Sequence, residues 1–263
     1  MQIDLLFHQL PLWLVYVITV AIVLLSFLSG LRFAIHIRRC KKSEIEAPVG
    51  SIVGAMLGLL AFILAFTFGM TASRFDARKQ LLLDEVNTIG TVYLRAEFLP
   101  EPQRSETQKL LRKYADIRTE AVRQPERLPQ ALVDSEALHE QLWSQVTSLS
   151  KQTSDSILIG LYIQSLNELI DLHSKRVTVA LQYRIPGAIW LALYFVTILA
   201  MAAVGYHFGI AGAGSFLISL VLALAFSAII LLIADLDRAG KGLITVSQKP
   251  MIELQQKLSL SAK

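Results

Sequence analysis

The chain has 263 residues, of which 54% are hydrophobic and 17% charged, and its mean hydropathy is +0.51. A typical soluble domain carries roughly 25% charged residues, so this composition predicts an integral membrane protein. The net charge of +4 suits a protein beside anionic lipid, and it is too small to indicate nucleic-acid binding. No basic run is interleaved with aromatic residues, so nucleic acid is not a predicted partner.

The first apolar stretch covers residues 12–30 and contains no charge. Trp13 and Tyr16 lie near its start, as aromatic residues at a membrane interface do. The residues before it contain no Lys or Arg, and no small-residue cleavage site follows it, which disfavours a signal peptide. We predict a membrane helix over residues 12–37, followed by a short loop with the basic residues Arg38, Arg39, Lys41 and Lys42.

The second apolar stretch, residues 49–72, is uncharged and long enough to cross a hydrocarbon core of about 30 Å as a helix. No proline interrupts residues 49–99, so we expect the membrane helix to continue into water as a charged, amphipathic helix. One edge of the membrane part consists of small residues, which are Gly50, Gly54, Gly58, Ala61, Ala65 and Gly69. Its first three glycines form two overlapping G-x-x-x-G steps, which let another helix backbone approach closely in lipid.

Phe62 and Phe66 lie one helical turn apart beside this small-residue edge. Two interpretations follow from the residue types alone. Several copies of this helix line a pore with the two rings as an apolar neck, or the helix simply packs against its neighbours with both rings facing lipid. The second is the more common situation for such a helix.

A long polar section follows, residues 74–184, with 15 Lys/Arg and 15 Asp/Glu. Its apolar residues recur at helical spacing, without the alternation of a strand. We predict three helical segments, the last of which is one long helix or two joined at the polar run 150–156. The predicted segments are residues 74–99, 102–123 and 129–183.

Two more uncharged apolar stretches, residues 185–206 and 215–234, predict the third and fourth membrane helices. The glycine-rich residues between them are expected to form a flexible turn over 205–214. Asp235, Asp237 and Arg238 end the fourth helix. The predicted fold is all-α, with these parts: a membrane helix pair in 1–73, an extramembrane helical section in 74–184, a second membrane pair in 185–234 and a polar tail in 235–263.

The side of the membrane that holds the helical section stays open. The positive-inside rule, applied to the short loop at residues 38–42, places that loop in the cytoplasm and the helical section outside. The opposite orientation is favoured by six basic residues that flank the helical section, which are Arg74, Arg78, Lys79, Lys175, Arg176 and Arg184.

Catalytic and metal-binding patterns are weak. Glu168, Asp171 and His173 are close in sequence but lack the i, i+4 spacing of a helical metal pair, so we interpret them as a solvated helix face. The acidic pairs are interpreted as a helix face (Asp84 and Glu85) and a membrane-boundary motif (Asp235 and Asp237), rather than as acid–base pairs. No nucleophile elbow or phosphate loop is present. We therefore expect no enzyme activity, no metal and no cofactor.

None of the four apolar stretches, residues 12–30, 49–72, 185–206 and 215–234, contains a charged residue. An intramembrane charge is the usual mark of an ion-coupled transporter, so this class is disfavoured. A channel is compatible with apolar spans, because hydrophobic constrictions can gate by dewetting.

Two motifs indicate a family. The segment from Phe62 through Arg74-Phe75-Asp76-Ala77-Arg78-Lys79 resembles the second membrane helix of bacterial bestrophins. A second motif resembles the signature of a bestrophin-like membrane family known as a domain of unknown function (DUF4239), and its residues are Glu85, Asn87, Gly90, Tyr93 and Arg95. The resemblance continues through Tyr114 and Arg118 and returns at Asp237 and Arg238 with Gly240 and Gly242.

This resemblance implies an oligomeric channel, for anions, in the inner membrane of a bacterium. Its partners would be the lipid bilayer, small inorganic anions and further copies of the chain, five in all if the assembly follows bestrophins. The implied roles are pore lining for Gly58, Phe62, Phe66 and Gly69 and pore mouth for Arg74, Arg78 and Lys79. Helix packing is predicted by the small-residue spacing itself for Gly50, Gly54, Ala61 and Ala65. The alternative is a non-conducting, membrane-anchored helical interaction or sensory module.

Overall fold

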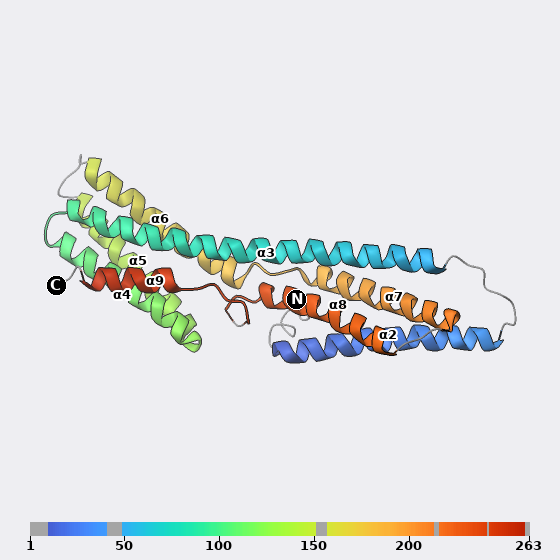
Figure 1. Cartoon of the computed structure of the whole chain (residues 1–263). Coiled ribbons are helices and arrows are strands. Elements are labelled where there is room, and N and C mark those ends of the chain that lie inside the picture. Colours follow the sequence, from blue (N-terminus) through green and yellow to red (C-terminus); the bar gives the residue numbers. More distant parts are fainter. Residues whose placement is uncertain (1–9, 41–48, 151–156, 213–215, 241, 261–263) are drawn as a thin grey trace. The chain divides into compact units, whose positions relative to one another are not determined.

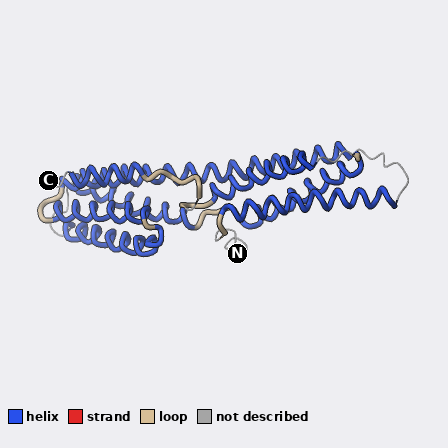
Figure 2. Tube along the Cα trace, turned by 60° about the horizontal axis from the view of Figure 1, so that its bottom comes forward, coloured by secondary structure: helices blue, strands red, loops and turns tan. Residues whose placement is uncertain are grey.

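The computed structural model describes residues 10–40, 49–150, 157–212, 216–240 and 242–260. Within these ranges the chain forms eight α-helices and two short 3-10 helices, and no strand (Figures 1 and 2). The prediction of an all-α fold is confirmed. Four helices contain apolar segments long enough to cross a membrane, and these are α2 (Leu12–Cys40), α3 (Val49–Arg95), α7 (Gly187–Ala211) and α8 (Phe216–Asp237).

The helix α3 continues without interruption from its apolar half into its charged half, as predicted. Its 47 residues correspond to about 70 Å of helix. The chain divides into two compact units, and α3 contributes its first half to one and its second half to the other. Unit 1 comprises Met1–Phe75 and Arg184–Thr245, and unit 2 comprises Asp76–Tyr183 and Val246–Lys263.

In unit 1, α2 and α7 approach closely through glycines. A Cβ atom added to Gly30 would collide with the backbone carbonyl of Ala202, and one added to Gly205 would collide with that of Phe27. At Gly209 an added Cβ would lie 2.5 Å from the Cβ of Ala34. These positions require glycine because the two backbones touch.

The predicted flexible turn at residues 205–214 is therefore wrong in its first part. Helix α7 continues to Ala211 and ends at Gly212, whose φ of 71° is the left-handed conformation common after a helix. Gly205 and Gly209 lie within the helix because they form its contact with α2. Residues 213–215 lie outside the described residues.

The apolar half of α3 has one buried face in unit 1. That face carries Val53, Leu60, Leu64, Thr67 and Thr71, all at most 8% exposed. Leu60 and Leu64 belong to a hydrophobic cluster with residues of α7 and α8, which include Trp190, Leu193, Ile230 and Ile233. The small-residue edge and the two phenylalanines lie outside this face.

Unit 2 is a helical bundle. It contains the second half of α3 together with α4 (Gln103–Arg123), α5 (Leu128–Ser150), α6 (Ile157–Leu181) and α9 (Lys249–Leu260), and the short helices η1 (Ala96–Phe98) and η2 (Pro125–Arg127). The long third segment of the predicted helical section is thus two helices, α5 and α6. Residues 151–156, where the polar run was placed, lie outside the described part of the chain.

The core of this bundle contains residues of α3, α4, α5 and α6 and of the C-terminal helix α9. Met251, Leu254 and Leu258 of α9 are buried in the same cluster as residues of α3 to α6. The other members of this cluster include Leu82, Ile89, Leu111, Leu142 and Leu166. The polar tail therefore contributes an amphipathic helix to unit 2.

Candidate functional site

The first candidate surface is the exposed face of the apolar half of α3. Phe62 and Phe66 are 68% and 60% exposed, and their rings stack on each other with centroids 6.5 Å apart. No described atom lies within 4 Å of a Cβ added to Gly54, Gly58 or Gly69. Both rings and these glycines thus lie on surface that no other described helix of the chain covers.

The other small residues of this edge are similarly placed. Ala61 and Ala65 are exposed. Gly50 has one near neighbour, because an added Cβ would lie 3.6 Å from the His207 side chain. Within one chain, the close approach predicted for Gly50, Gly54 and Gly58 is instead made by the glycines between α2 and α7.

The predicted pore-mouth residues differ from one another in environment. Nη1 of Arg74 lies 3.6 Å from the Oδ1 atom of Asp237. Arg78 is half-buried and Lys79 is exposed. Of these three basic residues, Lys79 has the most exposed charge and Arg74 has a carboxylate beside it.

Asp237 is 1% exposed at the C-terminal end of α8. Its Oδ1 atom accepts a 3.0 Å hydrogen bond from the backbone N–H of Ile185, just before α7. Together with the Arg74 ion pair, this places one carboxylate against α3 and against the segment that leads into α7. A hydrogen bond to a charged group contributes about 1.5–3 kcal/mol, so Asp237 has a structural role at this end of unit 1.

Asp235 shapes the loop that follows α8. It is 2% exposed, and it accepts hydrogen bonds from the backbone N–H groups of Leu243 (2.7 Å) and Ile244 (2.9 Å). A Cβ atom on Gly242 would collide with the Asp235 carboxylate. Gly240 has a φ of 90°, which favours glycine. Gly240 is therefore favoured by its backbone conformation, and Gly242 by its close contact with Asp235.

The second candidate region is a buried polar cluster around Glu85 in unit 2. Glu85 is 0% exposed. The hydroxyl of Tyr114 donates a 2.6 Å hydrogen bond to its Oε1 atom, and Nε of Arg118 lies 3.3 Å from the same oxygen. Arg176, from α6, pairs with the Oε2 atom. One carboxylate thus holds two guanidinium groups from two different helices.

Two histidines extend this cluster. The Tyr114 hydroxyl lies 3.0 Å from Nδ1 of His173, and the rings of His173 and His139 meet edge to face with centroids 4.8 Å apart. A phenol has one proton, and Tyr114 donates it to Glu85, so Nδ1–H of His173 donates to the Tyr114 oxygen.

The ionisation of these groups follows from their burial. Burial, with a smaller contribution from the Arg118 charge, lowers the pKa of His139 to about 4. Burial also lowers the pKa of His173 to about 3, with smaller contributions from Arg118 and His139. Burial raises the pKa of Tyr114 to about 12. Near neutral pH both imidazoles and the phenol are therefore uncharged.

The interpretation of His173 as part of a solvated helix face was wrong, and the helix face assigned to Glu85 is an internal one. His173 is 3% exposed and Glu85 is fully buried. Tyr114 and Arg118 are four residues apart and so share a face of α4. This spacing is the one sequence feature that indicates a buried acidic residue opposite that face. No sequence spacing linked His139 to His173. Among the described residues, no group of three or more His, Cys, Asp or Glu could hold a metal ion.

The other motif residues of α3 mostly bond or pack within unit 2. Arg95 donates a 2.7 Å hydrogen bond to the carbonyl of Leu161, and the buried Tyr93 accepts one of 3.1 Å from Arg112. An added Cβ at Gly90 would lie 3.9 Å from Leu254. The side chain of Asn87 is exposed.

These features define an all-α protein with four candidate membrane-spanning helices and a helical bundle built around a buried carboxylate. The chain matches the Bestrophin-like domain over residues 17–251 and belongs to this family. Comparison with curated proteins finds no match.

Solved structures share the fold. A bacterial bestrophin homolog from Klebsiella pneumoniae is 16% identical, with a TM-score of 0.63, covering 94% of this chain and 97% of that one. A point variant of that homolog is 17% identical, with a TM-score of 0.62, covering 96% and 99%. A structure described as a membrane protein is 17% identical, with a TM-score of 0.60, covering 90% and 95%.

Proposed function

We propose that the protein is an oligomeric channel for small inorganic anions, with the apolar half of α3 lining the pore. The observation that carries this proposal is the stacked pair Phe62 and Phe66, 68% and 60% exposed. The pair lies on surface of α3 that no described helix of the same chain covers. Membership of the bestrophin-like family supports a membrane assembly of this kind.

The geometry supports a physical mechanism. When several copies of α3 converge on an axis, Gly58 and Gly69 allow close approach and the two phenylalanines form an apolar neck. Water leaves such a neck readily, so an ion meets a desolvation barrier there. The exposed cation of Lys79, a few turns further along α3, raises the local concentration of anions.

The proposed setting is the inner membrane of a bacterium, with the lipid bilayer and identical subunits as partners. Five subunits are expected if the assembly follows bestrophins. The proposed packing surface between subunits is the edge formed by Gly50, Gly54, Ala61 and Ala65.

The test is chloride flux in liposomes that contain equal amounts of reconstituted protein. Replacing both Phe62 and Phe66 by alanine widens the neck, so the double variant should conduct more chloride than the wild type. The matched control replaces Leu191 and Phe195, which are also one turn apart and 67% and 60% exposed on α7. This control should leave the flux unchanged.

A charge reversal gives a second readout in the same assay. Lys79→Glu should shift the preference from anions toward cations if Lys79 faces the permeation path. Unchanged flux and selectivity in assembled Phe62/Phe66 and Lys79 variants would remove the pore assignment. If neither the wild type nor any variant conducts chloride, the alternative of a non-conducting helical interaction or sensory module is favoured.

A further inference from the structure

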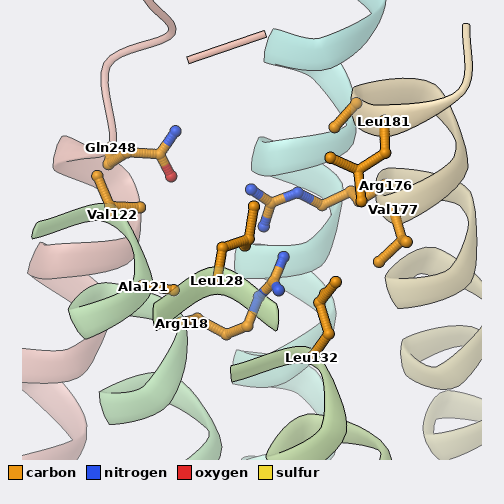
Figure 3. Close-up of a pocket in the computed structure, with 10 residues that line it drawn as sticks. Arg118, Ala121, Val122, Leu128, Leu132, Arg176, Val177, Leu181 and Gln248 are labelled. Atoms are coloured by element: carbon orange, nitrogen blue, oxygen red, sulfur yellow. The ribbon is translucent and has the colours of Figure 1, made fainter. Parts of the chain in front are cut away.

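A pocket of about 130 Å³ opens in unit 2 beside the Glu85 cluster. Residues of α4, α5 and α6 line it, together with Gln248 just before α9. Figure 3 shows the guanidinium groups of Arg118 and Arg176 reaching the same region from α4 and α6. The walls are largely apolar and include Leu132, Val177 and Leu181.

The charges at this pocket do not balance within the described residues. Two guanidinium groups meet a single carboxylate, that of Glu85. The neighbouring histidines add no negative charge, and they are neutral near pH 7 for the reasons given above. The cluster therefore has a surplus of one positive charge in a largely buried place, where an unbalanced charge is costly.

The guanidinium groups also have unused donors. Each arginine has five N–H donors. Arg118 approaches Glu85 through Nε, and Arg176 approaches it through Nη1. Beyond these two ion pairs, neither side chain makes a hydrogen bond to a described residue. Planar guanidinium forks match the geometry of a carboxylate, which they bind through two parallel hydrogen bonds.

The apolar walls and the volume restrict the kind of anion. A cavity of roughly 150 Å³ lined by apolar side chains accommodates benzene, so this pocket has room for a body of similar size. Val122 and Leu181, two of its lining residues, are 45% and 41% exposed, so the pocket is open to solvent. A compact inorganic anion would leave the apolar walls without a partner.

We propose that this pocket binds a small organic monocarboxylate with a short aliphatic or aromatic body. The carboxylate lies against Arg118 and Arg176 and balances their surplus charge, and the body lies against the apolar walls. This site is independent of the proposed channel, because it involves neither the apolar half of α3 nor ion flux.

The test uses the full chain in detergent, with benzoate as the probe. A ligand that binds only the folded state stabilises it by RT ln(1 + [L]/Kd), so the melting temperature rises with the ligand concentration. Thermal unfolding should shift upward with benzoate, and equal concentrations of benzyl alcohol, sodium chloride or sodium sulfate should produce no comparable shift. Equilibrium dialysis with radiolabelled benzoate measures the dissociation constant directly.

Two variants locate the binding. Ala180→Met fills the pocket without removing a charged group, and Ala137→Met adds the same side chain at an exposed position of α5 as the control. Ala180→Met should weaken benzoate binding by at least about tenfold, and Ala137→Met should not. Arg176→Lys keeps the positive charge beside Glu85 but loses the planar fork, and it too should weaken binding by about tenfold.

The proposal is overturned if benzoate neither shifts unfolding nor binds in dialysis. It is also overturned if benzyl alcohol or sulfate acts equally well, because then apolar contact or charge alone accounts for binding. Binding that is unchanged in Arg176→Lys overturns this site even if Ala180→Met fails to fold.

Discussion

The guanidinium of Arg74 lies 3.6 Å from the carboxylate of Asp237, which joins α3 to the end of α8 in unit 1. The sequence suggested a pore-mouth cation at Arg74 and a boundary motif of unknown partner at Asp237. The fold makes the two residues an ion pair and adds the backbone N–H of Ile185 as a hydrogen-bond donor to Asp237. Charge reversal at Arg74 would therefore set two carboxylates against each other and disturb folding. Lys79, which is exposed, is therefore the better position for a charge reversal that tests selectivity.

Replacing Asp237 by alanine should lower the free energy of unfolding by about 2–4 kcal/mol, because it removes a charged hydrogen bond and leaves Arg74 without this carboxylate. The control is Asp76→Ala, at an exposed position of α3. Its effect should stay within about 0.5 kcal/mol. Circular dichroism during unfolding in mixed detergent measures both. Equal stability of the two variants would make Asp237 a dispensable charge.

Replacing Glu85 by glutamine should be more costly, about 3–5 kcal/mol, since two partly or fully buried guanidinium groups lose their counter-charge. The neighbouring residue supplies the control, because the 2.8 Å bond that Asp84 accepts from Gln80 is exposed and is its sole side-chain hydrogen bond within the described parts of the chain. Asp84→Asn should change stability little. The same unfolding measurement applies, and a small effect of Glu85→Gln would show that the cluster does not depend on its acid.

The two buried histidines predict a pH dependence of stability. Burial lowers the pKa of His139 to about 4 and of His173 to about 3, below the value of about 6.5 in the unfolded chain. Between the folded and unfolded pKa values, the unfolded state binds more protons than the folded state. The stability that the two histidines contribute is therefore fully present above pH 6.5 and decreases as the pH is lowered below it. The two groups together contribute a slope of at most about 2.7 kcal/mol per pH unit.

The double variant His139→Gln and His173→Gln isolates this contribution. Its stability should fall less steeply than that of the wild type between pH 6.5 and pH 4.5. Carboxylates elsewhere titrate equally in both proteins and cancel in the comparison. Parallel curves would mean that the histidines titrate alike in the folded and unfolded chains.

Two glycines should respond differently to a bulky side chain. Gly209→Leu inserts into the contact between α2 and α7, where an added Cβ already lies 2.5 Å from Ala34, so folded protein should be lost. Gly58→Leu meets no described atom within 4 Å, so the chain should fold while the oligomer is disrupted. Yield and size-exclusion chromatography in detergent distinguish these results. An intact oligomer of Gly58→Leu would show that Gly58 does not lie at a close contact between subunits.

The sequence by itself determined the helices that depend on local pattern. Four uncharged stretches of sufficient length predicted the four candidate spans, and the absence of proline in residues 49–99 predicted that α3 continues past its apolar half. These features follow from hydropathy and from backbone hydrogen bonding within one segment, which neighbouring helices do not alter. The sequence also showed that Glu85, Tyr114 and Arg118 match a family motif, but it did not show that these three side chains contact one another.

Tertiary structure decided which polar residues are buried and which glycines form contacts. Glu85, His139 and His173 lie on three different helices, and no spacing along the chain encodes their meeting. Similarly, the sequence predicted close packing for the glycines at 54 and 58 and a flexible turn for those at 205 and 209. Among the described residues, only the latter two face another helix of the same chain. Burial of a charge and contact between backbones depend on the packing of distant segments, because a polar group is tolerated inside only where another segment supplies its partner.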